Sequence, residues 1–195
     1  VMAAEKEKLL RGFVEHGKLT HDKAERLWKL IEPFAAYGFN KAHAASYGRV
    51  AYQTAYMKAN FPVEYMSAVL TADSGNIEKI SEIIHECERM GIEILPPDIN
   101  ESMESFSVAN KKKIRFGLAA IKNVGINIVK AIIDDRSRNG NFANIDDFIR
   151  RIQHKDLNRK SLESLAKCGA LDGLGERAVL LTNRDQLLEY SRESQ

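Results

Sequence analysis

The sequence predicts a mainly α-helical protein that carries one small β-hairpin. Apolar residues recur at helical spacing along most of the chain, which is typical of helices with one buried face. Strand-like alternation is confined to the stretch between Phe106 and Phe116, around a lysine-rich turn. After Gly117 the apolar segments are short and are separated by tight turns, so short helices are expected there.

The N-terminal part is expected to form three helices. The first ends at Gly17, because glycine tolerates the left-handed backbone of a helix C-terminus. The second begins after Thr20, whose hydroxyl can cap it, and is expected to break at Pro33. A long helix then runs from about Ser46 to Asn60 and ends before Phe61-Pro62.

Two further helices and a hairpin follow. One helix is expected over about 63–71, and a second begins at an Asn76 cap and ends at Gly91. The segment 92–100 reads as a short extended run followed by a rigid Pro-Pro connection. Only the hairpin at 106–116 has the pattern of paired strands.

Composition limits the class of protein. The 195 residues are 44% hydrophobic and 29% charged, as expected for a globular chain of one or two domains. No run of about 18 apolar residues and no signal peptide is present. Cys87 and Cys168 lie far apart without a CxxC motif, which argues against a zinc site or a disulfide framework and favours a reducing cytoplasm. The opening residues suggest a piece of a longer protein.

Charge is distributed unevenly along the chain. Residues 1–110 contain 12 Lys and Arg against 16 Asp and Glu, a net charge of −4. Residues 111–170 contain 14 against 6, a net of +8, and residues 171–195 contain 3 against 5, a net of −2. A basic block between acidic flanks indicates a polyanionic partner, although a solvated face would have the same composition.

The basic block contains a candidate phosphate-binding hairpin. Asn123 and Gly125 form a tight turn that requires residues tolerant of positive φ. The helix that follows starts with unpaired amide groups, which attract anions. Lys122 and Lys130 flank this helix start, and Asn127 can add a hydrogen bond. The spacing resembles the helix–hairpin–helix family, which binds DNA backbones, with Asn123 at the usual first glycine. A plain αα-hairpin is the alternative.

A second, weaker copy is expected at 157–171. Its leucines supply packing, and Asn158, Arg159 and Lys160 supply polar groups that could reach DNA. It lacks a Gly-x-Gly turn of its own. The two copies together suggest a tandem helix–hairpin–helix module.

The stretch from Tyr37 to His43 combines groups that suit a nucleotide. Tyr37 offers a ring, Asn40 an amide, Lys41 an ammonium group and His43 an imidazole, all around a glycine. From the residues alone, a solvated turn explains this stretch better than a binding site does.

Long motifs make the chain similar to a known family. The run from Phe34 to Asp73, ILPPDIN at 94–100 and FGLAAIKNVG at 116–125 resemble the C-family of bacterial replicative DNA polymerases, the DNA polymerase III alpha subunits. The resemblance covers most of residues 1–175. Ala42 and Arg49 depart from it, since serine and an apolar residue are usual there.

The resemblance implies a domain organisation and a set of binding residues. Residues 1–100 would be a distal fingers subdomain, 101–175 a β-hairpin with a DNA-binding tandem helix–hairpin–helix module, and 176–195 a C-terminal helix or linker. Tyr37, Asn40 and His43 would lie beside the incoming nucleoside triphosphate and Lys41 near its phosphates. The tandem hairpins would grip the product duplex.

The resemblance also implies a DNA-directed DNA polymerase in which this fragment has no catalytic or metal-binding residue of its own. The family's acidic palm residues, which would hold Mg²⁺, are expected upstream, so the fragment alone would be inactive. Adjacent aspartates at 134–135 and 146–147 diverge on a helix and are expected to cap helices or to be solvated.

The implied partners are primer–template DNA, incoming dNTP, the palm, the sliding clamp and other replisome subunits. Two rival hypotheses stay open. One is a free-standing, non-enzymatic helix–hairpin–helix adaptor that binds DNA. The other is a helical scaffold without a nucleic-acid role.

Overall fold

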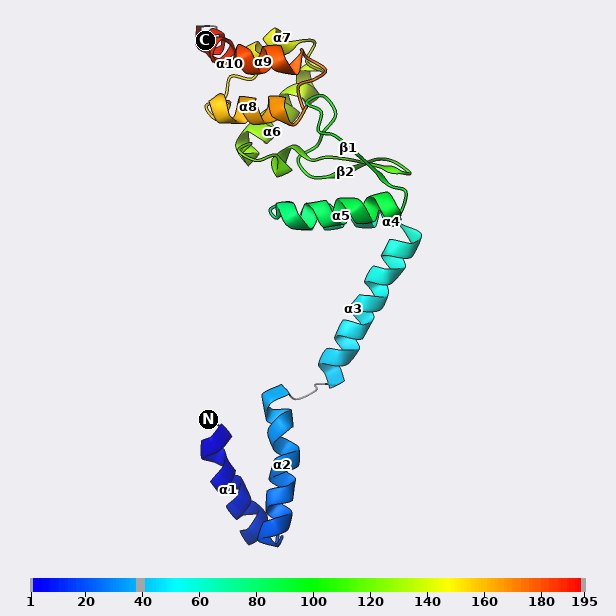
Figure 1. Cartoon of the computed structure of the whole chain (residues 1–195), viewed down its shortest axis with the longest axis vertical. Coiled ribbons are helices and arrows are strands. Elements are labelled where there is room, and N and C mark those ends of the chain that lie inside the picture. The colour runs from blue at the N-terminus through cyan, green and yellow to red at the C-terminus, as the bar shows by residue number, and fades with distance from the viewer. Residues whose placement is uncertain (1, 38–40, 194–195) are drawn as a thin grey trace. The chain divides into compact units, whose positions relative to one another are not determined.

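The chain forms two compact units, residues 1–55 and residues 56–195. The computed structural model describes the backbone of residues 2–37 and 41–193 and the side chains of residues 5–33 and 42–190. Most of the described chain is helical, with one small sheet in the second unit, so the predicted fold class is confirmed (Figure 1).

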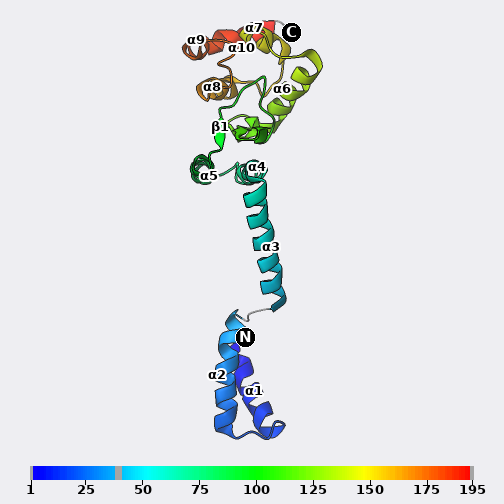
Figure 2. The same ribbon diagram turned by 90° about the vertical axis from the view of Figure 1, so that its right-hand side faces the viewer.

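The first unit contains a helical hairpin. Helices α1 (Met2–Glu15) and α2 (His21–Tyr37) lie side by side (Figures 1 and 2). Helix α1 ends at Glu15, and Gly17 lies in the connection, where a Cβ atom would lie 2.7 Å from the Phe13 carbonyl oxygen. The prediction of a left-handed backbone at Gly17 is wrong, because the left-handed residue is Lys18, with a φ of 52°. Ala24 and Trp28 are buried on the inner face of α2. This small apolar contact holds the hairpin together.

The predicted break at Pro33 is wrong, because α2 continues through Pro33 to Tyr37. A proline removes one helix hydrogen bond and crowds the preceding turn, yet a helix can accommodate it when the flanking residues favour helix. The flanking residues here include two alanines, which are the best helix formers.

Helix α3 (Lys41–Asn60) begins about five residues before its predicted start. Alanines at 42, 44 and 45 favour helix and extend it towards its N-terminus. It ends before Phe61-Pro62 as predicted. The exposed large side chains of this helix include Tyr47, Tyr52 and Tyr56, at 64%, 71% and 51%.

The second unit begins with two helices packed on a three-stranded sheet. Helices α4 (Pro62–Ala72) and α5 (Ile77–Arg89) precede strands β1 (Glu93–Leu95), β2 (Ser107–Asn110) and β3 (Lys113–Arg115). The Asn76 cap is confirmed, since its Oδ1 accepts the Lys79 amide at 3.2 Å. The first hydrophobic core lies between these helices and the sheet: Val63, Met66, Leu70, Ile80, Cys87, Ile92, Phe106 and Ile114.

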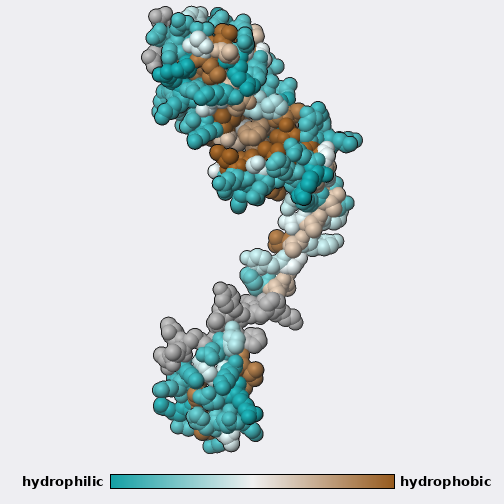
Figure 3. All heavy atoms as spheres, in the orientation of Figure 1, coloured by the Kyte–Doolittle hydropathy of each residue, from teal (hydrophilic) through white to brown (hydrophobic). Residues whose placement is uncertain are grey.

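The sheet contains one strand pairing that local pattern did not predict. The hairpin β2–β3 is antiparallel as expected, but β1 pairs in parallel with the other edge of β3, so that the order is β1-β3-β2. Part of this apolar layer stays open to solvent. Figure 3 shows hydrophobic side chains at the surface near α5, where Ile83, Ile84 and Ile94 are only partly buried.

The rest of the second unit is a group of short helices around a larger core. A 3₁₀ turn η1 (Leu118–Ala120) leads to α6 (Ile126–Asn139), α7 (Ile145–Arg151), α8 (Arg159–Lys167), α9 (Arg177–Thr182) and α10 (Arg184–Glu193). The largest fully buried side chains of this core are Leu118, Ile128, Ile132, Phe148, Leu162 and Leu165.

The structural units differ from the modules expected at residues 1–100, 101–175 and 176–195. Ile99 is 1% exposed within the larger core, and its amide donates to the Ala170 carbonyl at 2.8 Å. The pairing of β1 with β3 also crosses residue 100. Helices α9 and α10 pack against α8, and Leu180 is buried there. The net charge of the chain changes from negative to positive near residue 110, but the buried contacts do not divide the chain at that position.

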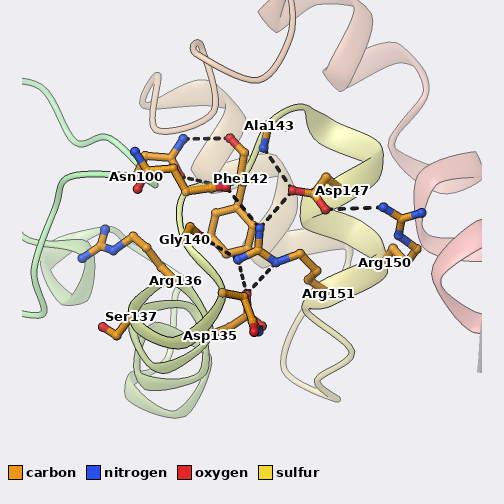
Figure 4. A network of polar contacts seen from close by, with 12 residues as sticks. Asn100, Asp135, Arg136, Ser137, Gly140, Phe142, Ala143, Asp147, Arg150 and Arg151 are labelled. Atoms are coloured by element: carbon orange, nitrogen blue, oxygen red, sulfur yellow. Dashed lines mark hydrogen bonds and ion pairs between the residues drawn. The ribbon is translucent and has the colours of Figure 1, made fainter.

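A polar cluster joins α6 to α7 (Figure 4). The Arg151 guanidinium pairs with Asp135 at 2.7 Å and Asp147 at 3.0 Å, and it donates to the Gly140 carbonyl at 2.7 Å. It also lies 4.2 Å from the centre of the Phe142 ring. Only 16% of its side chain is exposed, so these contacts are shielded from water.

Asp147 has a second role, in holding the segment that precedes α7, whose N-cap is Asn144 with its Oδ1 accepting the Asp147 amide at 2.9 Å. The Asp147 Oδ2 accepts the Ala143 amide at 3.0 Å. This backbone hydrogen bond, together with the Arg151 and Arg150 guanidinium groups, lowers the pKa of the Asp147 carboxyl. The prediction that the aspartate pairs are capping or solvated is confirmed for Asp134 and Asp146, which are exposed, and is wrong for Asp135 and Asp147, which both pair with Arg151.

We expect Arg151→Ala to lower the free energy of unfolding by about 2–3 kcal/mol, because it leaves two carboxylates without their shared cation. Arg150 is the matched control, since its side chain is 64% exposed and it pairs with Asp147 at 3.4 Å. Arg150→Ala should change stability by less than about 0.5 kcal/mol. Urea denaturation followed by circular dichroism measures both. Equal losses would contradict the role given to Arg151.

Candidate nucleic-acid interface

The first predicted hairpin is formed by η1, a tight turn and α6. Asn123 adopts a positive φ of 65°, as its place in the turn predicts. Val124 and Ile121 are buried and anchor the turn on the core. The arm before the turn is a single 3₁₀ turn instead of the predicted α-helix, because only three residues separate Gly117 from Ile121.

Gly125 does not need glycine's backbone freedom, contrary to the sequence prediction. Its φ is −74° and ψ 155°, an extended conformation that any residue can adopt. It is the N-cap of α6, and no side chain caps this end. A Cβ atom built on it would meet nothing within 4 Å. The start of α6 is thus open to a close approach from outside.

The polar residues predicted around this turn lie at the surface. Lys122, Asn127 and Lys130 are all exposed. Asn123 donates from Nδ2 to the Ser164 Oγ of α8 at 3.2 Å, and Asn127 Nδ2 lies 3.5 Å from an oxygen of Asp156. These two contacts attach the first hairpin to the second one.

A second copy is predicted at 157–171, but this range contains one helix, α8, so the predicted bounds are wrong and the hairpin in the structure is the connection from α7 to α8. Asn158 is the N-cap of α8, and its Oδ1 accepts the amides of Lys160 at 2.9 Å and Ser161 at 3.2 Å. Ser161 Oγ accepts the Asn158 amide at 2.9 Å, which completes a capping box. The Asn158 amide oxygen is therefore engaged within the protein. Arg159 pairs with Asp185 of α10 at 3.4 Å, while Lys160 is exposed.

The two hairpins share one open groove of about 690 Å³. Lys122 and Asn123 line it from the first hairpin, and Lys160 lines it from the start of α8. Sequence reasoning left Lys167 without a role, yet it also lines the groove and pairs with Glu163 at 2.5 Å. That pair lowers the pKa of the Glu163 carboxyl. In the sequence, the only indication that Lys160 and Lys167 share a face is their helical spacing.

Of the four residues predicted to bind nucleotide, the side chain of one is described. Tyr37 ends α2 and Lys41 begins α3, while Asn40 lies outside the described residues. His43 is exposed on α3, and its ring lies 4.1 Å from that of Tyr47.

In the described parts of the chain, no three or more His, Cys, Asp and Glu side chains lie together in a group that could hold a metal ion. Over the same residues, no helix is long and apolar enough to cross a membrane. Cys87 is buried, which raises the pKa of its thiol to about 11, and burial also raises the pKa of the Cys168 thiol. Neither thiol is activated as a nucleophile.

Two short hairpins on one core, each leading into a helix, are typical of the helix–hairpin–helix class; the start of α6 is open, whereas the start of α8 is closed by its capping box. A family model described as "Helix-hairpin-helix motif" matches residues 91–180. This range covers the sheet, both hairpins and most of α9.

Similarity to individual proteins extends over nearly the whole chain. The chain is 43% identical over 99% of its length to the DNA polymerase III subunit alpha of Thermus aquaticus. It is 46% identical over 94% of its length to that of Borreliella burgdorferi, and 42% over 93% to that of Escherichia coli. The chain belongs to the family of DNA polymerase III alpha subunits, and it spans 16% of the length of each of these three relatives.

The space around Gly117 and Gly125 differs, so we expect alanine at these two positions to have different effects on stability. Gly125→Ala should leave the free energy of unfolding within about 1 kcal/mol of wild type, because the backbone is permissive and the added methyl meets nothing. Gly117→Ala is the control. Its Cβ would lie 2.4 Å from the Ser105 carbonyl carbon, so we expect a loss of about 2 kcal/mol or more. Urea denaturation tests both variants, and a large loss for Gly125→Ala would show that the α6 start is not open.

Proposed function

We propose that the second unit binds the backbone of duplex DNA without reading its sequence. The observation that carries this proposal is the open start of α6: an uncapped helix N-terminus at Gly125, with exposed Lys122 and Lys130 on either side. Such a terminus presents unpaired amide donors and the positive end of the helix dipole to a phosphate. Because phosphates are the same at every base pair, the contact carries no sequence preference.

The second hairpin supplies further phosphate contacts. Lys160 is exposed at the first turn of α8, on the groove that the first hairpin also lines. The sequence predicts that Asn158 and Arg159 also contact DNA. For Arg159 this role stands, because its guanidinium can exchange Asp185 for a phosphate. Asn158 acts mainly through the cap that it makes on α8.

Within a full-length DNA polymerase III alpha subunit, we propose that this segment assists DNA-directed DNA synthesis. Residues 37–43 would position incoming dNTP, with Tyr37, Asn40 and His43 beside the nucleotide and Lys41 near its phosphates. Mg²⁺ would be held by palm residues outside this segment, so that the segment alone is inactive. Primer–template DNA, the sliding clamp and other replisome subunits would be the partners, in the bacterial cytoplasm.

The rival function, a free-standing DNA-binding adaptor, needs only the hairpins. Similarity to polymerase subunits reaches 93–99% of the chain, whereas the helix–hairpin–helix model matches only residues 91–180. The similarity outside the hairpins favours the polymerase over the adaptor.

Lys122→Ala and Lys130→Ala should each weaken duplex binding and flatten the slope of log K against log salt by about one. The effect should be equal for two unrelated sequences. Lys111→Ala removes the same charge from the exposed turn of the β-hairpin and serves as the control, with no change expected. Fluorescence anisotropy of labelled duplexes measures all three. A change in sequence preference would contradict backbone binding.

The nucleotide role is tested in a reconstituted full-length polymerase. His43→Ala should raise the apparent KM for dNTP about three- to tenfold, as expected for the loss of one hydrogen bond of about 1 kcal/mol. His85→Ala, at an exposed histidine that pairs with Glu88 on α5, is the matched control. A KM unchanged by His43→Ala would favour the adaptor and leave residues 37–43 with a structural role.

A further inference from the structure

The groove shared by the two hairpins has an apolar floor that a DNA backbone does not use. It is lined by Phe116, which follows β3, by Ala120 of η1 and by Ile121, which follows η1, while exposed lysines form the rim. The charged phosphates of a duplex offer this floor no apolar surface to bury. An occupant that fills the groove must therefore carry apolar groups as well as negative charge.

The floor is built for aliphatic groups more than for stacked bases. Phe116 is half-buried, and its ring packs at 4.6 Å and 59° against Phe106. The Phe116 ring is thereby engaged by another ring, and the other floor residues, Ala120 and Ile121, offer no flat surface. Single-stranded nucleic acids need aromatic platforms for successive bases, so a strand of DNA or RNA is a poorer match.

The rim is positively charged. Lys122, Lys160 and Lys167 lie on it against the single carboxylate of Glu163. Glu163 is already paired with Lys167 at 2.5 Å, and so the remaining ammonium groups attract an anionic ligand. Ser164 and Asn123 add hydrogen-bonding groups at one wall.

We propose that this groove binds an acidic peptide segment of a protein partner, with aliphatic side chains on the floor and carboxylates on the lysine rim. The combination is the one by which short amphipathic helices dock into grooves on other proteins. Because Lys122 and Lys160 also serve the proposed duplex site, the peptide and the duplex compete. The predicted competition rests on the proposed duplex binding, whereas the peptide site itself does not.

The probe for the test is a fluorescein-labelled peptide of about twelve residues, made of glutamates with three leucines at helical spacing. Anisotropy with the 195-residue chain should give saturable binding with a Kd of about 10–100 μM. The double variant Lys160→Glu/Lys167→Glu should weaken binding about tenfold or more. Lys111→Glu, which makes the same type of change on the β-hairpin turn, should not. Circular dichroism checks that every variant is folded.

The role of the floor is tested with a peptide in which serines replace the leucines, and that peptide should bind at least about fivefold more weakly. The proposal is overturned by no binding up to about 1 mM, or by equal binding of the serine peptide. It is also overturned if oligo(dT) binds with the same dependence on Lys160 and Lys167, because a single strand would then be the occupant.

Competition with duplex DNA separates this inference from the proposed function. Unlabelled duplex should displace the peptide, and simultaneous binding would contradict the shared use of Lys122 and Lys160. If the peptide binds to the groove while no duplex binds at low salt, the proposed function fails and the groove keeps its assignment.

Discussion

The Arg151 ion-pair cluster is the constraint on which the rest of the second unit depends. Its guanidinium holds Asp135 of α6 and Asp147 of α7, and so it fixes the turn between them (Figure 4). Asn100 exchanges two hydrogen bonds with the Phe142 backbone, at 2.8 and 3.0 Å, inside the same turn. Arg136 donates to the carbonyl of Ile99 at 2.9 Å. These contacts hold the Pro-Pro segment, α6 and α7 as one body, which positions both hairpins.

This constraint changes how the basic block is interpreted. The net charge of +8 over residues 111–170 includes arginines whose charge is used inside the protein. Arg151 is neutralised by two carboxylates, and burial lowers the pKa of the Arg136 guanidinium, which is directed at backbone carbonyls. The charges left for a polyanion are mainly the lysines of the hairpins. The net charge of a sequence segment thus overstates how many charges can bind a polyanion. Burial and ion pairs in the structure show which basic side chains are available.

Local sequence patterns predicted what depends on local contacts. The Asn76 cap and the left-handed Asn123 each follow from a few neighbouring residues. Features that join distant segments could not be predicted in this way. The parallel pairing of β1 with β3 and the contact of Asn123 with Ser164 depend on the tertiary fold. The groove shared by the hairpins, and the place of Lys167 on it, follow from such long-range contacts.

The central claim is that two hairpins, held in one body, grip a single duplex together. The most direct test compares the salt dependence of duplex binding for Lys122→Ala, Lys160→Ala and the double variant, by anisotropy. If both lysines contact phosphates at once, each single change flattens the log–log slope by about one and the double change by about two. A slope that Lys160→Ala leaves unchanged, alone or in the double variant, would contradict the claim and restrict the DNA contact to the first hairpin.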